Sequence, residues 1–283
     1  MQIIDGKKVS SQILQRLAEE GKRCRESSGK TPGLAVVLVG EDPASQVYVR
    51  NKNKQCIEIG FSSFEHRLAA ETSQEELMRL IAVLNADPAV HGILVQLPLP
   101  QQIDSDTVLG SIDPKKDVDG FHPINIGGMW MGQEVLLPCT PAGVIEMLEN
   151  YKIPIAGQNA VVIGRSNIVG KPLSALLLKR HATVTICHSR TKDLSRVCAS
   201  ADLLFAAIGK PRFITKDMVR PGAVVIDIGI NRVDGKLCGD VDFQAVSGKV
   251  SYITPVPGGV GPMTIAMLMA NTLKAFRRAE NME

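Results

Sequence analysis

Residues 160–172 read Ala-Val-Val-Ile-Gly-Arg-Ser-Asn-Ile-Val-Gly-Lys-Pro, and this stretch decides the fold. It begins with apolar, mostly β-branched residues, which are typical of a strand buried on both faces. Gly164 ends the run, and apolar residues then recur at helical spacing from Ile168 to Leu177. A buried strand, a glycine turn and a helix therefore follow one another, as in an α/β domain.

The turn between this strand and this helix is suited to binding a phosphate group. The first N–H groups of a helix have no partner within it, and the helix dipole adds positive potential there. A dinucleotide fingerprint reads Gly-x-Gly-x-x-Gly, whereas Gly164, Ser166 and Gly170 give Gly-x-Ser-x-x-x-Gly. Taken alone, the pattern leaves open a dinucleotide site and an ordinary strand–helix turn.

The end of the next expected strand, 183–187, distinguishes NAD from NADP. NAD sites place an acid there, which accepts hydrogen bonds from the ribose 2′-hydroxyl group. Here the strand is followed by His188-Ser189-Arg190-Thr191, and Arg165 adds a second guanidinium group. Guanidinium groups suit a 2′-phosphate, which an acid would repel; the alternative is that both arginines are ordinary surface charges. We predict NADP, bound by Gly164, Arg165, Ser166, Ser189 and Arg190.

The composition describes a well-filled core and a balanced surface. Of the 283 residues, 45% are hydrophobic, and 32 basic against 29 acidic residues give a net charge of +3. The sequence contains no stripe of basic residues of the kind that predicts a nucleic-acid-binding surface. Every apolar run is too short to span a bilayer. Because the start of the sequence lacks the apolar segment of a signal peptide, we expect a cytoplasmic protein. The six cysteines lack C-x-x-C spacing, which predicts reduced thiols rather than disulfides or zinc ligands.

The order of expected elements predicts two α/β domains. Helices and buried strands alternate in the first part, with strands at 34–39 and 92–97 and a possible short strand at 62–67. A second group of strands is expected near 160–163, 183–187, 203–208, 223–228 and 250–254. We predict a first domain at 1–139, to which the last helix at about 264–283 returns, and a second domain at 140–263.

Polar residues in the first domain indicate a site of chemistry. Tyr48 and Lys52 are four residues apart on an expected helix, so they share a face. Gln96 interrupts an apolar strand near its carboxyl end, and stranding a buried amide without partners costs about 1–3 kcal/mol. Asp117 and Asp119 lie in a glycine-flanked loop that can reach the same place. The alternatives are a solvated lysine and acids that only cap turns.

Five motifs follow one another along the chain. They are Tyr48-x-x-x-Lys52, Asn85-x-Asp87 followed by Gly-Ile-Leu-Val-Gln96-Leu-Pro-Leu, Lys116-Asp-Val-Asp-Gly-Phe-His122, Gly164-Arg-Ser-x-x-Val-Gly170-x-Pro, and Pro257-Gly-Gly-Val-Gly-Pro-Met-Thr264. Together they closely resemble the bacterial family of bifunctional methylenetetrahydrofolate dehydrogenase/methenyltetrahydrofolate cyclohydrolase. The resemblance covers nearly the whole chain without a departure at a motif position, and the family's serine accounts for Ser166.

The resemblance implies two α/β domains around a cleft, the second a Rossmann-type NADP-binding domain. It also implies a folate substrate, a homodimer and two successive reactions in one cleft. Hydride leaves the methylene carbon of 5,10-methylenetetrahydrofolate for NADP, and water then converts the 5,10-methenyl cation into 10-formyltetrahydrofolate.

The same resemblance implies roles for individual residues. Lys52 is the main catalytic residue and Gln96 its hydrogen-bond partner, and a neutral lysine can accept a proton when water attacks. Tyr48 stacks on the pterin and relays a proton, while Asp119 anchors the polar edge of the pterin. The backbone of Pro257, Gly258 and Gly259 approaches the folate, and Ile230 lies by the cofactor.

Two other interpretations compete with this one. A protein similar to shikimate dehydrogenase shares the domain order and a basic turn after the second strand. It gives no reason for the Gln-Leu-Pro-Leu and Pro-Gly-Gly-Val-Gly-Pro-Met-Thr blocks. The other is a catalytically inactive NADP-binding regulator, which the intact Lys52, Gln96 and Asp119 disfavour.

Overall fold

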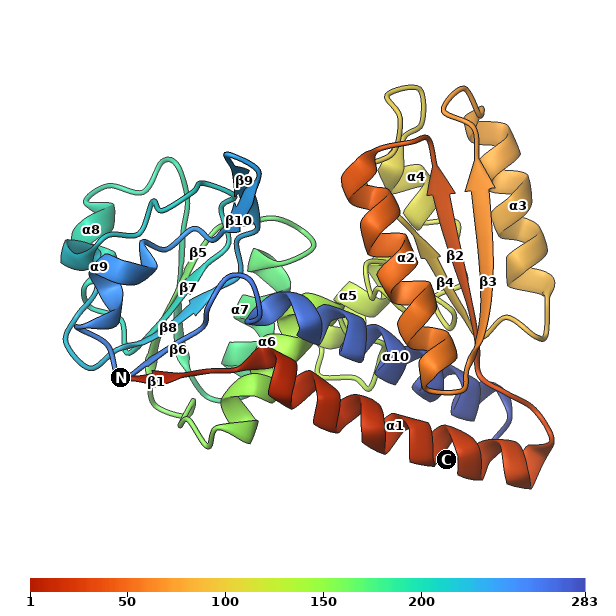
Figure 1. Cartoon of the computed structure of the whole chain (residues 1–283), viewed down its shortest axis with the longest axis horizontal. Helices are drawn as coiled ribbons and strands as arrows, with labels where there is room; N and C mark the ends of the chain where they lie inside the picture. Colours follow the sequence, from red (N-terminus) through yellow and green to blue (C-terminus); the bar gives the residue numbers. More distant parts are fainter. Residues whose placement is uncertain (283) are drawn as a thin grey trace. The chain divides into compact units, whose positions relative to one another are not determined.

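The computed structural model describes residues 1–282, and the chain divides into two compact units (Figure 1). Residues 1–11 and 140–267 form one, which we call the six-stranded unit after its main sheet. Residues 12–139 and the C-terminal residues from Leu268 form the three-stranded unit. Both main sheets are parallel and alternate with helices along the chain, which confirms the expected α/β class.

In the sheet of the six-stranded unit, the strand that precedes the Gly164 turn lies next to an edge strand. The strands of this sheet lie in the order β1 (Gln2–Ile3), β11 (Tyr252–Ile253), β8 (Val224–Asp227), β7 (Leu203–Ala206), β5 (Asn159–Ile163) and β6 (Thr183–Cys187). Along the chain, β5 is followed by its neighbour β6 on one side and then by β7 on the other. The connections diverge at the carboxyl end of β5, where open α/β sheets bind ligands.

The core of this unit explains its apolar strands. Val161, Leu204 and Val225, from three neighbouring strands, belong to one buried cluster. Strands covered on both faces have no side that must be polar, so they read as apolar runs. The remaining elements are α6 (Cys139–Asn150), α7 (Gly170–Lys179), α8 (Leu194–Cys198), the 3₁₀ helix η1 (Lys216–Met218), the hairpin of β9 (Asn231–Val233) and β10 (Lys236–Cys238), and α9 (Phe243–Ser247).

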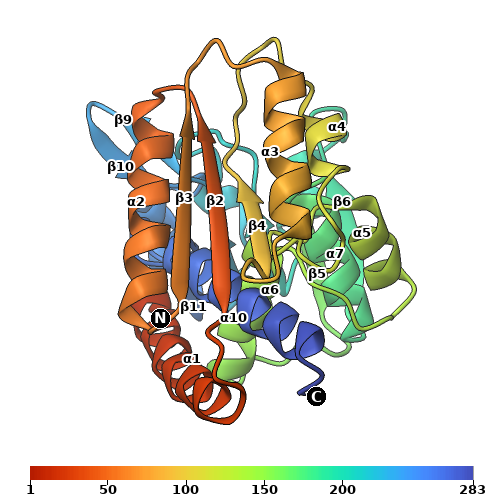
Figure 2. The same cartoon turned by 90° about the vertical axis from the view of Figure 1, so that its right-hand side faces the viewer.

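The three-stranded unit is built on β2 (Gly33–Val39), which lies between β3 (Ser62–Leu68) and β4 (Gly92–Val95). Every residue of β2 is buried. Ala35, Val37 and Val39 pack in one core with residues of α3 (Gln74–Ala86), and the alternate residues face the opposite side. Helix α2 (Pro43–Glu58) contacts β2 and β3, and Figure 2 shows α2 and α3 flanking the sheet. Two short helices complete the unit, α4 (Ser105–Leu109) and α5 (Pro123–Trp130).

Two long helices contribute to both units. The division between the units falls inside α1 (Gly6–Ser28) and inside α10 (Val260–Ala279). Each unit therefore contains segments that are distant in sequence. Within residues 1–282, no helix combines the length and the apolar character needed to cross a membrane.

The compact units differ from the expected domains at two places. Residues 1–11 belong to the six-stranded unit, because Gln2 and Ile3 pair in parallel with Tyr252 and Ile253. The division in the last helix falls after Met267, whereas we expected it at about 264. A strand of two residues is too short to give a periodic pattern, so the sequence did not reveal this pairing.

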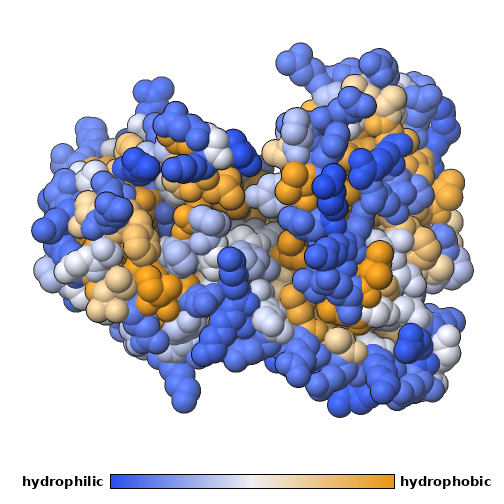
Figure 3. Space-filling view, viewed as in Figure 1, coloured by the Kyte–Doolittle hydropathy of each residue, from blue (hydrophilic) through white to orange (hydrophobic). Residues whose placement is uncertain are grey.

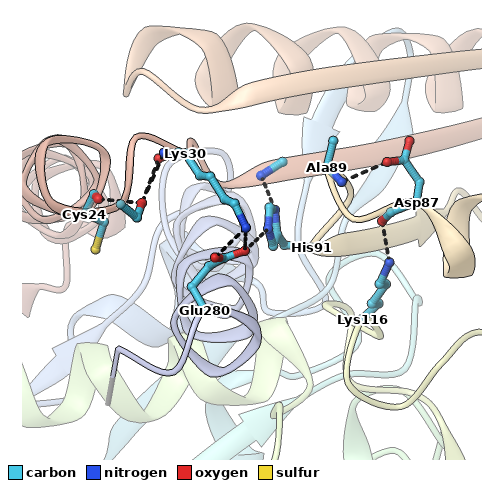
Figure 4. A network of polar contacts seen from close by, with 9 residues as sticks. Cys24, Lys30, Asp87, Ala89, His91, Lys116 and Glu280 are labelled. Atoms are coloured by element: carbon cyan, nitrogen blue, oxygen red, sulfur yellow. Dashed lines mark hydrogen bonds and ion pairs between the residues drawn. The ribbon is translucent and has the colours of Figure 1, made fainter.

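A partly buried network ties Glu280, after α10, to residues of the three-stranded unit (Figure 4). Glu280 pairs with Lys30 at 2.7 Å between Oε2 and Nζ, and His91 packs edge-on against Phe276 of α10. Nδ1 of His91 accepts a hydrogen bond from the N–H group of Gly33 at 3.0 Å. Its ring proton therefore resides on Nε2, which faces Glu280 Oε1 at 3.8 Å. Burial lowers the pKa of His91, so the ring stays neutral near pH 7.

The six cysteines are free, and five of them are buried. Burial raises the pKa of Cys56 and of Cys198 to about 12, so these thiols stay protonated and unreactive. The face of the molecule in Figure 3 is mostly hydrophilic, with apolar residues in small groups.

Candidate functional site

Helix α2 presents Tyr48 and Lys52 from the three-stranded unit. The helix begins at Pro43, and the Asp42 carboxylate caps it by accepting a hydrogen bond from the N–H group of Ser45 at 2.7 Å. Lys52 is only 7% exposed, whereas Tyr48, one turn earlier, is 38% exposed. Partial burial raises the pKa of Tyr48. Lys52 is therefore not a solvated surface lysine, which was the alternative that the sequence left open.

Gln96 is the hydrogen-bond partner of Lys52. The lysine Nζ donates to Gln96 Oε1 at 3.0 Å, and the amide nitrogen of Gln96 donates to the Leu97 carbonyl at 2.6 Å. Lysine has donors only, so it fixes the amide with its oxygen toward Nζ. The strand β4 ends at Val95, earlier than the expected 97, and Gln96 follows its carboxyl end. Pro98 lacks the N–H group that a continuing ladder would need.

The two acids of the Lys116-Asp-Val-Asp-Gly motif have different surroundings. Asp117 is buried and accepts hydrogen bonds from the N–H groups of Phe121 at 3.2 Å and His122 at 2.8 Å, and from the amide of Asn125 at 2.8 Å. Both oxygens of the carboxylate are therefore engaged by donors of the chain itself. Asp117 thus holds the loop and is not available to a ligand.

Asp119 is the acid that remains available. Across residues 1–282, the structure records no hydrogen bond to its carboxylate. Burial raises the pKa of Asp119 to about 6, although the positive charge of Lys52 opposes this shift. The three-stranded unit thus combines a buried lysine, its amide partner and an unsaturated carboxylate, a set that can exchange a proton and accept hydrogen bonds from a ligand.

A further layer supports Asp119, and the sequence did not reveal it. The amide of Asn271, in α10, donates to the carbonyl groups of Val118 and Leu137, both at 2.8 Å. The thiol of Cys139 also donates to the Val118 carbonyl, at 3.2 Å. These contacts fix the backbone directly before Asp119. A buried amide in an apolar helix, at Met267–Leu273, was the signal that would have identified Asn271.

The glycine turn after β5 packs closely against the loop that follows β7. Gly164 has a φ of 123°, and a Cβ atom there would lie 2.2 Å from the Ala207 carbonyl oxygen. Only glycine fits such a position. The Ser166 hydroxyl accepts hydrogen bonds from the N–H groups of Val169 at 3.1 Å and Gly170 at 3.3 Å. Ser166 therefore caps the start of α7, which gives a physical reason for serine in place of glycine.

The turn after β6 lies beside this glycine turn. The N–H group of Gly164 donates to the Cys187 carbonyl at 2.9 Å, which joins the carboxyl ends of β5 and β6. His188 shapes the second turn, since its Nδ1 accepts from the N–H group of Arg190 at 3.1 Å. Three side chains that we expected to contact the cofactor are exposed at these two turns: Arg165, Ser189 and Arg190.

The remaining candidate residues also lie in the six-stranded unit. Ile230 follows β8 and is 46% exposed. Gly258 has a φ of 102°, and its carbonyl accepts from the N–H group of Lys7 at 3.2 Å. A Cβ atom on Gly6 would lie 1.8 Å from the Gly259 carbonyl oxygen, so this segment packs tightly against the start of α1. Pro257, Gly258 and Gly259 are thus in a different unit from Tyr48, Lys52, Gln96 and Asp119.

Family models match both parts of the chain. Residues 4–119 match the catalytic domain of tetrahydrofolate dehydrogenase/cyclohydrolase. Residues 138–280 match the NAD(P)-binding domain of the same family. The two matches together cover most of the chain.

Similar proteins and structures agree with these matches. The bifunctional protein FolD of Streptococcus pneumoniae serotype 4 is 58% identical over 278 residues, which is 98% of both chains. The crystal structure of the FolD methylenetetrahydrofolate dehydrogenase/cyclohydrolase of Campylobacter jejuni has a TM-score of 0.96 at 52% identity and covers both chains fully. A Trypanosoma brucei FolD structure, complexed with NADP and an inhibitor, has a TM-score of 0.95 at 39% identity over 98% of each chain. Shikimate 5-dehydrogenase from Thermus thermophilus, at 15% identity and a TM-score of 0.52 over 87% of this chain and 99% of its own, shares the fold alone.

We predict that Asp119→Asn stabilises the protein at alkaline pH. The folded state raises the pKa of Asp119 from its ordinary value of 3.8 to about 6, so it binds a proton that the unfolded state has already released. Stability therefore falls as the pH rises through this range, by about 3 kcal/mol in total. The variant lacks this loss and should exceed the wild type at pH 8 but not at pH 4.

Urea unfolding at both pH values, followed by circular dichroism, measures this difference. Glu71→Gln, which neutralises an exposed carboxylate of the same unit, is the matched control and should show no pH-dependent gain. A wild type as stable as Asp119→Asn at pH 8 would contradict the assigned environment of Asp119.

Proposed function

The chain belongs to the tetrahydrofolate dehydrogenase/cyclohydrolase family, and from this membership we propose which residues carry out its two reactions. The protein is a bifunctional enzyme that oxidises 5,10-methylenetetrahydrofolate to 5,10-methenyltetrahydrofolate and hydrolyses the product to 10-formyltetrahydrofolate. The observation that best supports our residue assignment is the contact of 3.0 Å between buried Lys52 and Gln96.

The cofactor is NADP, which accepts the hydride when bound. We propose that it binds at the carboxyl ends of β5 and β6. The glycine turn and the N-terminal end of α7 suit its phosphates. Arg165 and Arg190 carry the positive charges that a 2′-phosphate requires, and residues 188–192 contain no acid. Gly164, Ser166, Ser189 and Ile230 complete the proposed set.

We propose that the folate meets Tyr48 and Asp119 in the three-stranded unit. The half-exposed ring of Tyr48 can stack on the flat pterin. The Asp119 carboxylate has free lone pairs for the N–H groups at the pterin's polar edge. In the six-stranded unit, the backbone of Pro257, Gly258 and Gly259 is proposed to approach the same substrate.

Lys52 is the proposed base for the hydrolysis. One of its N–H groups is directed to Gln96. The proposed base is the deprotonated form of this amine, whose lone pair can accept a proton. As water attacks the bridging methenyl carbon, Lys52 takes a proton from that water, and the negative charge of Asp119 favours the resulting ammonium group. The bond between this carbon and N5 then breaks, the remaining proton of the added hydroxyl group passes to N5, and the carbon stays on N10 as the formyl group.

We further propose a homodimer that works in the cytoplasm. The strand β6 lies at one edge of its sheet, and Thr183, Thr185 and Ile186 on it are exposed. An uncovered edge offers unpaired backbone groups to another strand, which supports pairing with a second copy. The free cysteines suit a reducing compartment.

Light scattering after size-exclusion chromatography tests the dimer. We expect a mass of two chains for the wild type and of one chain for Ile186→Lys, because like charges at the edge oppose pairing. Leu178→Lys, at an exposed position of α7, should remain a dimer. A dimeric Ile186→Lys variant would exclude this edge, and a monomeric wild type would exclude the dimer.

We predict that Lys52→Met abolishes the cyclohydrolase activity and retains NADP binding. Removing a general base lowers a rate by about 10²–10⁴-fold. The assay follows the decay of 5,10-methenyltetrahydrofolate in the absence of NADP, and cofactor fluorescence measures the binding of NADPH. Lys54→Met, which changes an exposed lysine two residues further along α2, should keep both properties. Unimpaired ring opening in Lys52→Met would remove Lys52 from the mechanism.

We also predict that the wild type prefers NADP to NAD and that Arg165→Ala weakens this preference. A hydrogen bond to a charged group contributes about 1.5–3 kcal/mol, so the KM for NADP should rise at least about tenfold while the KM for NAD stays constant. Ser189→Ala should have a smaller effect in the same direction. Arg196→Ala, on α8, is the control and should leave both constants unchanged. Equal affinities of the wild type for NADP and NAD would refute the assignment.

A further inference from the structure

Two buried carboxylates at the carboxyl edge of the six-stranded sheet have no role in either reaction as described above. Asp227 is the last residue of β8, and Asp240 follows the hairpin of β9 and β10. Both are almost completely inaccessible, with exposed fractions of 3% and 0%. A buried carboxylate is costly unless hydrogen bonds satisfy it, so their partners indicate what they hold.

Asp240 holds the loop that follows β7. Its carboxylate accepts hydrogen bonds from three successive N–H groups, those of Ile208 at 2.7 Å, Gly209 at 3.1 Å and Lys210 at 2.8 Å. The preceding residue, Ala207, is the one whose carbonyl oxygen lies against Gly164 of the cofactor turn.

Asp227 holds the loop that follows its own strand. One carboxylate oxygen accepts from the N–H groups of Gly229 at 3.1 Å and Asp240 at 2.9 Å, and the other accepts from Val241 at 2.9 Å. Glycine permits the close approach of these groups. A Cβ atom on Gly229 would lie 2.2 Å from the Asp240 carboxylate, and one on Gly239 would lie 1.8 Å from that of Asp227.

Ile230 lies between the two anchored positions. The N–H group of the residue before it, Gly229, donates to Asp227, and the amide of the residue after it, Asn231, donates to Asp240 at 2.9 Å. The two acids therefore hold the backbone directly before an exposed apolar side chain and the side chain of the residue directly after it. An acceptor-only group is needed at both sites, because every partner is a donor.

We propose that Asp227 and Asp240 are positioning residues for the cofactor, which hold Ile230 and the loop after β7 in the geometry that NADP requires. This inference rests on the cofactor role proposed above for Ile230. The hydrogen-bond partners of both acids named above all belong to the six-stranded unit. Their removal should therefore impair cofactor use much more than the hydrolytic reaction, which needs no cofactor.

Asp240→Asn tests the proposal, because it keeps the shape of the side chain and replaces one acceptor oxygen by a donor. We expect the KM for NADP to rise about tenfold or more, with kcat at saturating NADP within about twofold of the wild type. Hydrolysis of 5,10-methenyltetrahydrofolate without NADP should stay within about twofold as well, which also shows that the variant is folded.

Three further variants make the outcome decisive. Gly229→Ala keeps both acids and displaces the Asp240 carboxylate, so it should reproduce the rise in the KM for NADP. If Asp240→Asn does not fold, Gly229→Ala tests the positioning role in its place. Asp242→Asn changes a neighbouring acid that caps α9 through the N–H group of Ala245, and it should match the wild type. Ile230→Ala tests the cofactor role of Ile230 directly.

The results separate three failures. An unchanged KM for NADP in Asp240→Asn, or in Gly229→Ala, overturns the proposal, as does a parallel loss of both activities with KM constant. An unchanged KM in Ile230→Ala overturns the cofactor role of Ile230 instead. A wild type without NADP-dependent oxidation overturns the proposed function itself.

Discussion

Burial of parallel strands on both faces is the constraint on which this structure depends. The strands β2, β4, β7 and β8 are buried along their whole length, so their interior positions are occupied almost entirely by apolar side chains. Polar groups that serve a ligand can be placed where such strands end. Gln96 after β4, Gly164 after β5 and Asp227 at the end of β8 occupy such positions. The same packing rule thus locates the candidate residues in both units.

The buried acids fall into two classes by the number of donors they meet. Asp117, Asp227 and Asp240 each accept at least three hydrogen bonds from the chain itself, and each fixes a loop. Asp119 is the exception, since its carboxylate has a lysine nearby and free lone pairs. Saturated acids organise the backbone, whereas the unsaturated acid retains the capacity to bind something else. This distinction depends on three-dimensional contacts and is invisible in the Lys116-Asp-Val-Asp-Gly motif.

Sequence reasoning succeeded where the signal was local. Apolar residues located β5, before Gly164, and β6, the next strand along the chain. The four-residue spacing placed Tyr48 and Lys52 on one helix. It failed where the partners are distant in sequence. The strand β1 is recognisable only through its pairing with β11. The role of Asn271 is recognisable only through its hydrogen bond to the Val118 carbonyl. Asp227 was within reach, because it ends the apolar run Ala-Val-Val-Ile-Asp as Gln96 ends Ile-Leu-Val-Gln.

The pairing of β1 with β11 has a consequence for biosynthesis. A ribosome that makes this chain releases Gln2 and Ile3 about 250 residues before their partners Tyr252 and Ile253. The three-stranded unit likewise lacks Asn271, Phe276 and Glu280 until the last residues emerge. Domains usually fold as units during translation, the N-terminal one first. Here neither unit has its full set of contacts until residues 252–280 have been made, so the nascent chain carries both units incomplete up to that point.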